Sequence, residues 1–504
     1  MEKSMNELKR LLVEAGDLKA VNAILEWDQS TYLPAGGVAA RSRQASLVAR
    51  LAQEKATDPR IGRLLDKLTP YAERLGYDHP DAALVRVARR KYERAIKVPP
   101  AFMGVLYALD AESYSVWAKA RQENDFRAVQ PYLEKILEYS RRLADFFPGY
   151  EHIADPLIDF YDYGMKATTL RQLFAELRRE LVPLVQAILA QPTIDDSCLR
   201  HFFDPQKQLR ISEELIAKLG YDFKRGRQDL THHPFTTSFA SGDVRVTTRV
   251  QEHYLGECLF SSIHEAGHAM YEQGVRPEFD STPLGNGTSA GVHESQSRLW
   301  ENQIGRSRGF WEYALPLLQN TFPEQLKKVK LEEFYRAVNK VSRSLIRTDA
   351  DEVTYNLHIM IRFELELGLL EGKLQVRDLP EIWHARYQSD LGVHAPDDRD
   401  GVLQDVHWYA WLIGGAFQGY TLGNIIGAQF FAAALRAHPE IPAEIRAGRF
   451  ATLHGWLVEN IYQFGSMYTA DELVSRVTGE PLSIRPYISY LKSKYGEIYS
   501  LNQG

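Results

Sequence analysis

The sequence predicts a mainly α-helical protein with little β structure. From the N-terminus to about residue 150, apolar residues recur at intervals of three and four, as in Leu8, Leu11, Leu12, Leu18, Val21, Ile24 and Leu25. This spacing is typical of amphipathic helices, and prolines at positions 34, 80, 99 and 100 divide it into separate segments. Residues 168–220 continue the helical pattern. Helices are therefore expected over well above half of the chain.

One strand pair interrupts the helices, at residues 235–240 and 243–248. Both segments are rich in Thr, Val and Phe, and the turn residues Ser241 and Gly242 join them. The hairpin could present a strand edge to an extended peptide, or it could serve packing alone. Beyond it, long helices are expected at about 331–341, 347–372, 379–392 and 405–438.

Composition indicates a globular protein. The chain has 504 residues, of which 44% are hydrophobic and 25% charged, and this is enough for a deep core and a cleft. It contains no Gly/Ser-rich or Pro-rich linker and no internal repeat. We therefore expect one unit over residues 1–504, with an N-terminal helical lobe of about 1–150 packed on a core of about 151–504.

Charge and targeting signals exclude several classes of partner. A formal net charge of -6 argues against nucleic-acid binding. The two cysteines, Cys198 and Cys258, form no C-x-x-C pair, which fits a reducing compartment. The start of the chain lacks the apolar core of a signal peptide, and no stretch of about twenty apolar residues suggests a membrane span. A cytoplasmic location is expected.

A metal-binding pattern lies within residues 261–274. His264-Glu265-Ala266-Gly267-His268 is an H-E-x-x-H sequence, in a segment with helical apolar periodicity. On a helix, His264 and His268 lie on one face and can hold one metal ion, while Glu265 beside them can reach a metal-bound water. The alternative is a coincidence of two histidines, which is expected in only about a few of every hundred such chains.

A third ligand is needed, because a catalytic zinc usually takes three protein ligands and leaves a position for water. The best candidate is Glu294, in the segment Gly291-Val-His-Glu-Ser-Gln296. A turn containing Pro and Gly, residues 282–288, can fold this second helix back against the first. The sequence thus predicts a metal site made by His264, His268 and Glu294.

Four further segments combine charged or hydroxyl groups with apolar helix patterns: His233-Pro-Phe235, Asp243-Val-Arg-Val-Thr247, residues 346–355 (IRTDADEVTY) and residues 401–408 (GVLQDVHW). Together with the H-E-x-x-H and H-E-S-Q sequences, these segments resemble the carboxypeptidase Taq family of thermostable metallocarboxypeptidases. The resemblance extends over essentially the whole chain, from Trp27-Asp-Gln29 to the C-terminal helices.

The resemblance implies a neurolysin-like, two-lobed helical fold with a deep groove, and a homodimer. It implies a zinc enzyme, with cobalt as a substitute, that releases single amino acids from peptide C-termini with broad specificity. In that chemistry zinc activates a water and Glu265 accepts its proton. His407 and Tyr420 are implied to line the site near the scissile carbonyl. This chain reads Phe417-Gln-Gly-Tyr-Thr421 where many members carry a longer G-Y-F-P-T-Y run.

Recognition of a terminal carboxylate calls for a guanidinium that can hold both oxygens. Arg347 and Arg245 are candidates by their positions in the motifs, and His233 is a further candidate for substrate binding. The alternative for each arginine is a salt bridge, Arg347 to the acidic residues that follow it and Arg245 to Asp243. Asp351 and Glu352 either orient a histidine ligand or are helix charges.

The sequence leaves two other functions open. A non-catalytic helical protein with a structural zinc is one, although structural zinc sites usually have four ligands rich in cysteine. An endopeptidase or dipeptidyl carboxypeptidase with the same metal chemistry is the other, because H-E-x-x-H does not determine where along a peptide the cut falls.

Overall fold

The computed structural model describes residues 1–501. Helices hold 67% of the residues and strands 3%, which confirms the mainly α prediction. Within residues 1–501, no helix is both long and apolar enough to cross a bilayer. Backbone contacts divide the chain into two units: unit 1 comprises residues 1–96, 196–338 and 430–480, and unit 2 comprises residues 97–195, 339–429 and 481–504. Each unit is thus assembled from separate stretches of chain.

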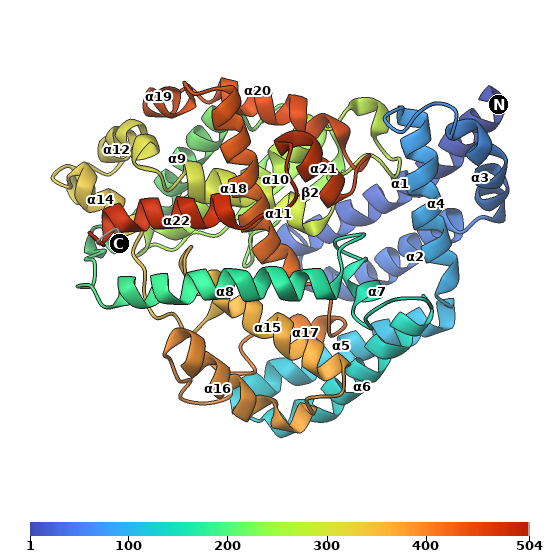
Figure 1. Ribbon diagram of the computed structural model, residues 1–504, viewed down its shortest axis with the longest axis horizontal. Helices are drawn as coiled ribbons and strands as arrows, with labels where there is room; N and C mark the ends of the chain where they lie inside the picture. Colours follow the sequence, from blue (N-terminus) through green and yellow to red (C-terminus); the bar gives the residue numbers. More distant parts are fainter. Residues whose placement is uncertain (502–504) are drawn as a thin grey trace. The chain divides into compact units, whose positions relative to one another are not determined.

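The helices of unit 1 are α1 (Glu2–Thr31), α2 (Val38–Ala56), α3 (Pro59–Ala72), α4 (Pro80–Lys97), α9 (Pro205–Leu219), α10 (Leu255–Gly274), α11 (Ala290–Arg298), α12 (Arg308–Thr321), α13 (Pro323–Leu326), α14 (Leu331–Val338), α19 (Ile441–Arg446), α20 (Ala451–Asn460) and α21 (Ala470–Thr478). Helix α10 lies at the centre, in contact with α9, with α11 and with the sheet (Figure 1). Most of its residues are buried, because its sequence is largely apolar or small, with a few ionisable groups that include those of its H-E-x-x-H segment.

A three-stranded sheet packs on α10. Strands β1 (Gln228–Leu230), β2 (Thr236–Ala240) and β3 (Asp243–Thr248) have the order β1-β3-β2, with β1 parallel and β2 antiparallel to β3. The expected hairpin is confirmed. Strand β1 was not anticipated, because a strand of three residues gives no periodic signal. The order leaves β2 at an edge of the sheet, and β2 also contacts α1.

Two helices of unit 1 approach so closely that only glycine fits between them. A Cβ atom on Gly267 of α10 would lie 2.6 Å from the Cα atom of Ser297 and 2.7 Å from the main-chain oxygen of Gln296, both in α11. Backbone atoms cannot yield as a flexible side chain does. Helix α11 continues into a π-helical segment, η4 (Leu299–Ile304), which also contacts α10. Such π turns often carry functional side chains.

The helices of unit 2 are α5 (Pro100–Glu123), α6 (Phe126–Asp145), α7 (Asp155–Ile158), α8 (Ala167–Leu189), α15 (Tyr355–Leu370), α16 (Leu379–Leu391), α17 (His407–Ala410) and α22 (Arg485–Ile498), while α18 (Gln418–Ala437) runs from unit 2 into unit 1. Helix α15 is the core of unit 2, with Arg362 and Glu366 buried among its apolar residues. It contacts α6, α8 and α16.

Two expected helices of unit 2 are shorter than the sequence indicated. The prediction of one helix over 405–438 was wrong, because Gly414 and Gly415 have φ angles of 104° and 90° and separate α17 from α18. The prediction of a helix over 347–372 was also wrong at its start. The carboxylate of Asp351 accepts hydrogen bonds from the main-chain N–H groups of Val353 and Thr354, so regular helix begins at Tyr355.

We predict that Gly267→Ala destabilises unit 1 and shifts α11 away from α10. Overpacking of this kind typically costs about 1–3 kcal/mol, and chemical unfolding should show a loss of that order. Gly455→Ala is the matched control. Gly455 lies in α20 with nothing within 4 Å of an added Cβ, so alanine should leave stability unchanged or raise it by about 0.5–1 kcal/mol. Equal effects of the two substitutions would contradict the packing constraint.

Candidate metal centre and active-site residues

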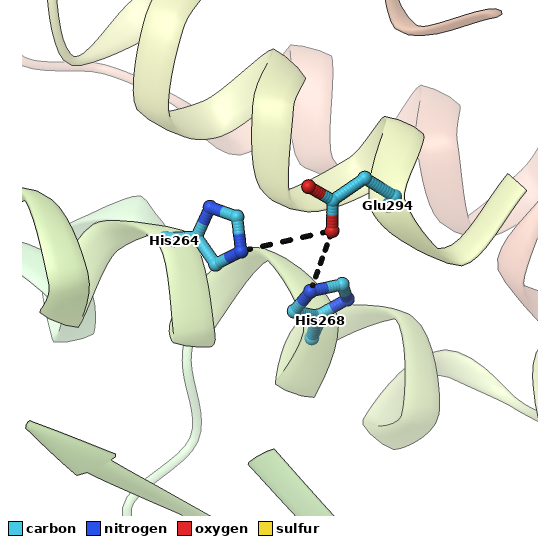
Figure 2. A group of neighbouring side chains, drawn as sticks. All are labelled: His264, His268 and Glu294. Atoms are coloured by element: carbon cyan, nitrogen blue, oxygen red, sulfur yellow. Dashed lines mark ion pairs between the residues drawn. The ribbon is translucent and has the colours of Figure 1, made fainter. Parts of the chain in front are cut away.

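Three side chains of unit 1 converge on one point, His264 and His268 from α10 and Glu294 from α11 (Figure 2). The Oε2 atom of Glu294 lies 3.7 Å from Nε2 of His264 and 3.3 Å from Nε2 of His268. Tetrahedral zinc with bonds of about 2.0–2.2 Å requires neighbouring donors about 3.3–3.5 Å apart. The donor set therefore fits a divalent metal without rearrangement of the backbone, and it is the candidate cluster within residues 1–501.

The imidazole proton of His264 is on the nitrogen that faces away from the candidate metal position. Its Nδ1 atom lies 2.9 Å from Oε2 of Glu301 in η4, so Nδ1–H donates to that carboxylate and Nε2 keeps its lone pair for a metal. Arg298 and Arg306 donate to the same carboxylate. Although burial acts to lower the pKa of His264, the carboxylates of Glu294 and Glu301 raise it above its usual value.

His268 is oriented through a second histidine. Its Nδ1 atom lies 2.6 Å from Nδ1 of His293, and Nε2 of His293 lies 2.8 Å from Oε1 of Glu272. One proton on each histidine satisfies both hydrogen bonds: His268 donates to His293, and His293 donates to Glu272. Burial lowers the pKa of His268 to about 4. The ring is therefore neutral near pH 7, the form that binds metals.

Glu294 is held as a carboxylate. The guanidinium of Arg298 donates to its Oε1 atom at 2.7 Å, which leaves Oε2 directed at the two histidines (Figure 2). Burial acts to raise the pKa of Glu294, but the charge of Arg298 and the two histidines hold it well below its usual range. A carboxylate oxygen beside two imidazole nitrogens is the ligand set of an open catalytic metal site.

Glu265 lies beside the metal centre and is 7% exposed. The hydroxyl oxygen of Thr236, in β2, lies 2.7 Å from Oε2 of Glu265 and 2.8 Å from its main-chain oxygen. Within residues 1–501, Oε1 accepts no hydrogen bond, so one carboxylate oxygen is anchored while the other can take a proton. Burial raises the pKa of Glu265, which is the direction required of a general base that works near neutral pH.

Two further predicted residues belong to unit 1. Both Nε and Nη2 of Arg245 donate to Asp243, at 2.9 and 2.8 Å. The guanidinium also lies over the ring of Trp27, 4.3 Å from its centroid. The salt bridge between Arg245 and Asp243, which was the alternative to substrate binding, is therefore present. His233 is exposed, in the connection between β1 and β2.

Unit 2 brings Arg347, His407 and Tyr420 together around the buried carboxylate of Asp405. Nδ1 of His407 lies 2.5 Å from Oδ1 of Asp405, and its Nε2 lies 3.2 Å from the hydroxyl of Tyr420. Nε of Arg347 donates to Oδ2 at 2.6 Å, and Nε of Arg362 at 2.9 Å. Burial acts to raise the pKa of Asp405, but these two guanidinium groups hold it well below its usual range.

Arg347 pairs with Asp405 and not with the acidic residues that follow it in the sequence. Its Nη1 also donates to the hydroxyl of Tyr355, at 3.2 Å. Asp351 accepts hydrogen bonds from the main-chain N–H groups of Val353 and Thr354, just before α15. Glu352 is buried against Lys494, whose Nζ lies 2.7 Å away. The carboxylate and imidazole that orient the metal-site histidines are instead Glu301 and His293.

Sequence reasoning missed the residues that support the metal ligands. His293 stands directly before Glu294, in a segment that the sequence analysis singled out. Glu301 follows Glu294 by seven residues, a separation that returns to the same helix face only over two turns, which gives a weak signal. Thr236 and Glu272 are distant in sequence from Glu265 and His293 and reach them through tertiary packing. Asp405 stands only two residues before its partner His407, within the segment 401–408.

We predict that Glu301→Gln weakens metal binding by about 10–100-fold, because a supporting hydrogen-bond acceptor fixes the orientation and basicity of a histidine ligand. Titration of zinc or cobalt into chelator-stripped protein measures the affinity. Glu257→Gln is the control. Glu257 lies on α10, the helix that carries His264 and His268. Like Glu301 it pairs with an arginine, here Arg249, but it contacts no residue of the candidate metal site. An unchanged affinity in Glu301→Gln would show that the hydrogen bond is dispensable.

Comparison with known proteins shows which family this chain resembles. The family model of the carboxypeptidase Taq (M32) metallopeptidases matches residues 7–495. Thermostable carboxypeptidase 1 of Thermus thermophilus is 42% identical over 498 residues, covering 96% of this chain and 97% of that protein. Carboxypeptidase 1 of Bacillus subtilis is 36% identical over 480 residues, with 95% of each covered.

Solved structures agree as well. The crystal structure of the M32 carboxypeptidase from Deinococcus radiodurans R1 matches with a TM-score of 0.96 and 50% identity, over 99% of this chain and 100% of that one. A carboxypeptidase of Pyrococcus furiosus matches with a TM-score of 0.94 and 30% identity, over 98% and 99%. Family model, relatives and fold all lead to the same assignment, and the chain belongs to the carboxypeptidase Taq (M32) family of metallopeptidases.

Proposed function

We propose that this metallocarboxypeptidase uses zinc to release single amino acids from the C-termini of peptides, with broad specificity and with Glu265 as the general base. The observation that carries the proposal is the convergence of His264, His268 and Glu294 on one point with the carboxylate of Glu265 beside it. Two imidazoles and one carboxylate are the donors of catalytic zinc sites. Cobalt is expected to substitute, since the same nitrogen and oxygen donors bind it.

A bound zinc ion would supply Lewis acidity, which activates water and polarises a carbonyl group. The protein's own part is the movement of one proton. Thr236 anchors Oε2 of Glu265, so Oε1 is free to accept a proton from the attacking water and then to give it to the leaving amine. Burial favours the protonated form of Glu265 and so makes its transient protonation less costly.

The substrate main chain is proposed to bind along strand β2. Main-chain N–H groups of Val244 and Val246 donate to the main-chain oxygens of Arg225 and Arg227. The main-chain groups of the residue between them, Arg245, therefore point towards β2. In that register Thr237 pairs with Arg245, and Thr236 and Ser238 direct their main-chain groups to the free edge. An extended peptide can add to such an edge by main-chain hydrogen bonds, independently of its side chains. This mode fits broad specificity.

His407 and Tyr420 are proposed to act near the scissile carbonyl, as the family resemblance implies. Asp405 fixes the His407 ring through Nδ1, which presets the opposite nitrogen and the Tyr420 hydroxyl. Preset donors stabilise developing negative charge without reorganisation. Arg347, Arg245 and His233 are proposed to bind substrate, with one arginine at the terminal carboxylate. Both guanidinium groups already hold an aspartate, so a substrate carboxylate would share their remaining donors.

Glu265→Gln should bind metal normally but lose turnover by about two to four orders of magnitude or more, since the amide keeps the shape of the side chain and loses the base. Single-turnover rates and metal content measure the two effects. His264→Ala, His268→Ala or Glu294→Ala should lose metal and activity together. A near-normal kcat in the Glu265→Gln enzyme would show that Glu265 is not the general base.

The position of the cut is tested with matched peptides. We expect a peptide with a free C-terminus to be cleaved with a much higher kcat/KM than the same peptide as its amide, because a guanidinium binds the terminal carboxylate. Product sequencing should show a single C-terminal residue as the first product. Arg347→Ala should weaken cleavage of the acid more than that of the amide while metal stays bound. Internal fragments as first products would instead indicate an endopeptidase.

Three further features are proposed on the same basis: a homodimer, a cytoplasmic location and a single catalytic unit over residues 1–504, with an N-terminal lobe of about 1–150 and a core of about 151–504. The family resemblance supports the dimer, and light scattering of the purified protein tests it. Cys198 and Cys258 are buried and form no C-x-x-C pair, which fits a reducing compartment.

A further inference from the structure

A recess in unit 1 lies outside the metal centre. Its volume is about 320 Å³, and helices α1, α2 and α4, strand β2 and the loop 281–286 form its walls. We refer to it as the lysine recess, after Lys19 and Lys91, the cations that line it beside Ser238, Phe239, Ala240 and Asn286. Most of its other walls are small apolar residues, so it has room for a side chain.

Two lysines line the lysine recess, and no acidic residue within residues 1–501 lines it. Neither Lys19 nor Lys91 forms an ion pair with a described residue. Nζ of Lys91 donates one hydrogen bond to the main-chain oxygen of Pro283, at 2.8 Å, and an ammonium has three donors. Burial, Lys19 and Arg90 lower the pKa of Lys91 to about 7, and the carboxylate of Glu272 opposes this shift. An anion in the recess would relieve this repulsion.

Strand β2 connects the lysine recess to the reacting groups. The strand begins at Thr236, which contacts Glu265, and continues through Ser238 to Ala240 in the recess wall. At about 3.3 Å per residue, Ser238 and Ala240 lie about 7 and 13 Å along the strand from Thr236. A peptide extended along this free edge would therefore reach the recess about two to four residues from the cleaved bond.

The loop from α10 to α11 makes a second connection. Asn286 lines the recess and donates to Oε2 of Glu272, at 3.2 Å. Glu272 accepts the hydrogen bond of His293, which contacts the ligand His268. The lysine recess thus shares a wall with the groups that orient the metal ligands. This placement favours a subsite of the same substrate over an unrelated surface site.

We propose that the lysine recess is a subsite for an acidic side chain of the peptide substrate, about two to four residues upstream of the cleaved bond. The inference rests on the proposed function, since it requires a peptide held along β2. Its chemistry is a charge-assisted hydrogen bond between a carboxylate and one or both ammonium groups. The enzyme would then accept many C-terminal residues while preferring acidic sequences before them.

The test compares peptides that differ only by Glu or Gln at each of the second to fifth residues before the cleaved bond. For the wild-type enzyme we expect Glu to exceed Gln in kcat/KM by about tenfold at one or two of these positions, equivalent to about 1.4 kcal/mol. In Lys19→Met/Lys91→Met this ratio should fall to within about twofold of one. Lys218→Met, which changes an exposed lysine of α9 outside the recess, should keep the wild-type ratio.

The ratio is internal to each enzyme, so a change in overall activity does not affect the result. Should the double variant fold poorly, Lys91→Glu provides a second readout, since it should shift the preference from Glu towards Lys at the same position. A wild-type Glu/Gln ratio near one at every position would overturn the proposal, as would a ratio that survives in the double variant. Failure of the proposed function would give a different result, because neither the Glu peptide nor the Gln peptide would release its C-terminal residue.

Discussion

The close packing of α10 against α11 and η4 is the constraint on which the metal centre depends. Where Gly267 meets the backbone of Gln296 and Ser297, the two helix axes come close enough for side chains one turn apart to share a metal. Glu294 reaches both histidines across this contact. Glu301 reaches His264 from the π-helical segment that follows. A side chain at position 267 would separate donors whose spacing has to match bonds of about 2 Å.

The site also depends on how buried charges are compensated. A carboxylate removed from water costs several kcal/mol unless ion pairs and hydrogen bonds replace its hydration. Glu294 and Glu301 therefore share the guanidinium of Arg298. In unit 2, Arg347 and Arg362 share Asp405. Because each group is held by more than one partner, it is fixed in position before a substrate arrives, and this reduces the reorganisation that the reaction requires.

Chemistry and recognition make different demands on this fold. In the proposed function, the reacting groups of unit 1 stand on helices and on the first residue of β2, where packing against neighbouring elements holds them in place. Recognition of the substrate main chain needs only a free strand edge, which the order β1-β3-β2 supplies. The lysine recess lies along the same strand. The proposed broad acceptance of C-terminal residues and the proposed selectivity further along the peptide are therefore compatible within one unit.

The sequence by itself determined the features that arise locally. Helical periodicity gave the fold class, alternation with a Ser-Gly turn gave the β2–β3 hairpin, and the four-residue spacing of His264 and His268 gave two ligands on one helix face. Glu294 followed from the need for a third ligand on a neighbouring helix. Tertiary structure alone decided which residues support these ligands, that β2 lies at a sheet edge, and that two unpaired lysines share a recess. The physical reason is that such partners come from distant segments, so no spacing along the chain encodes their contact.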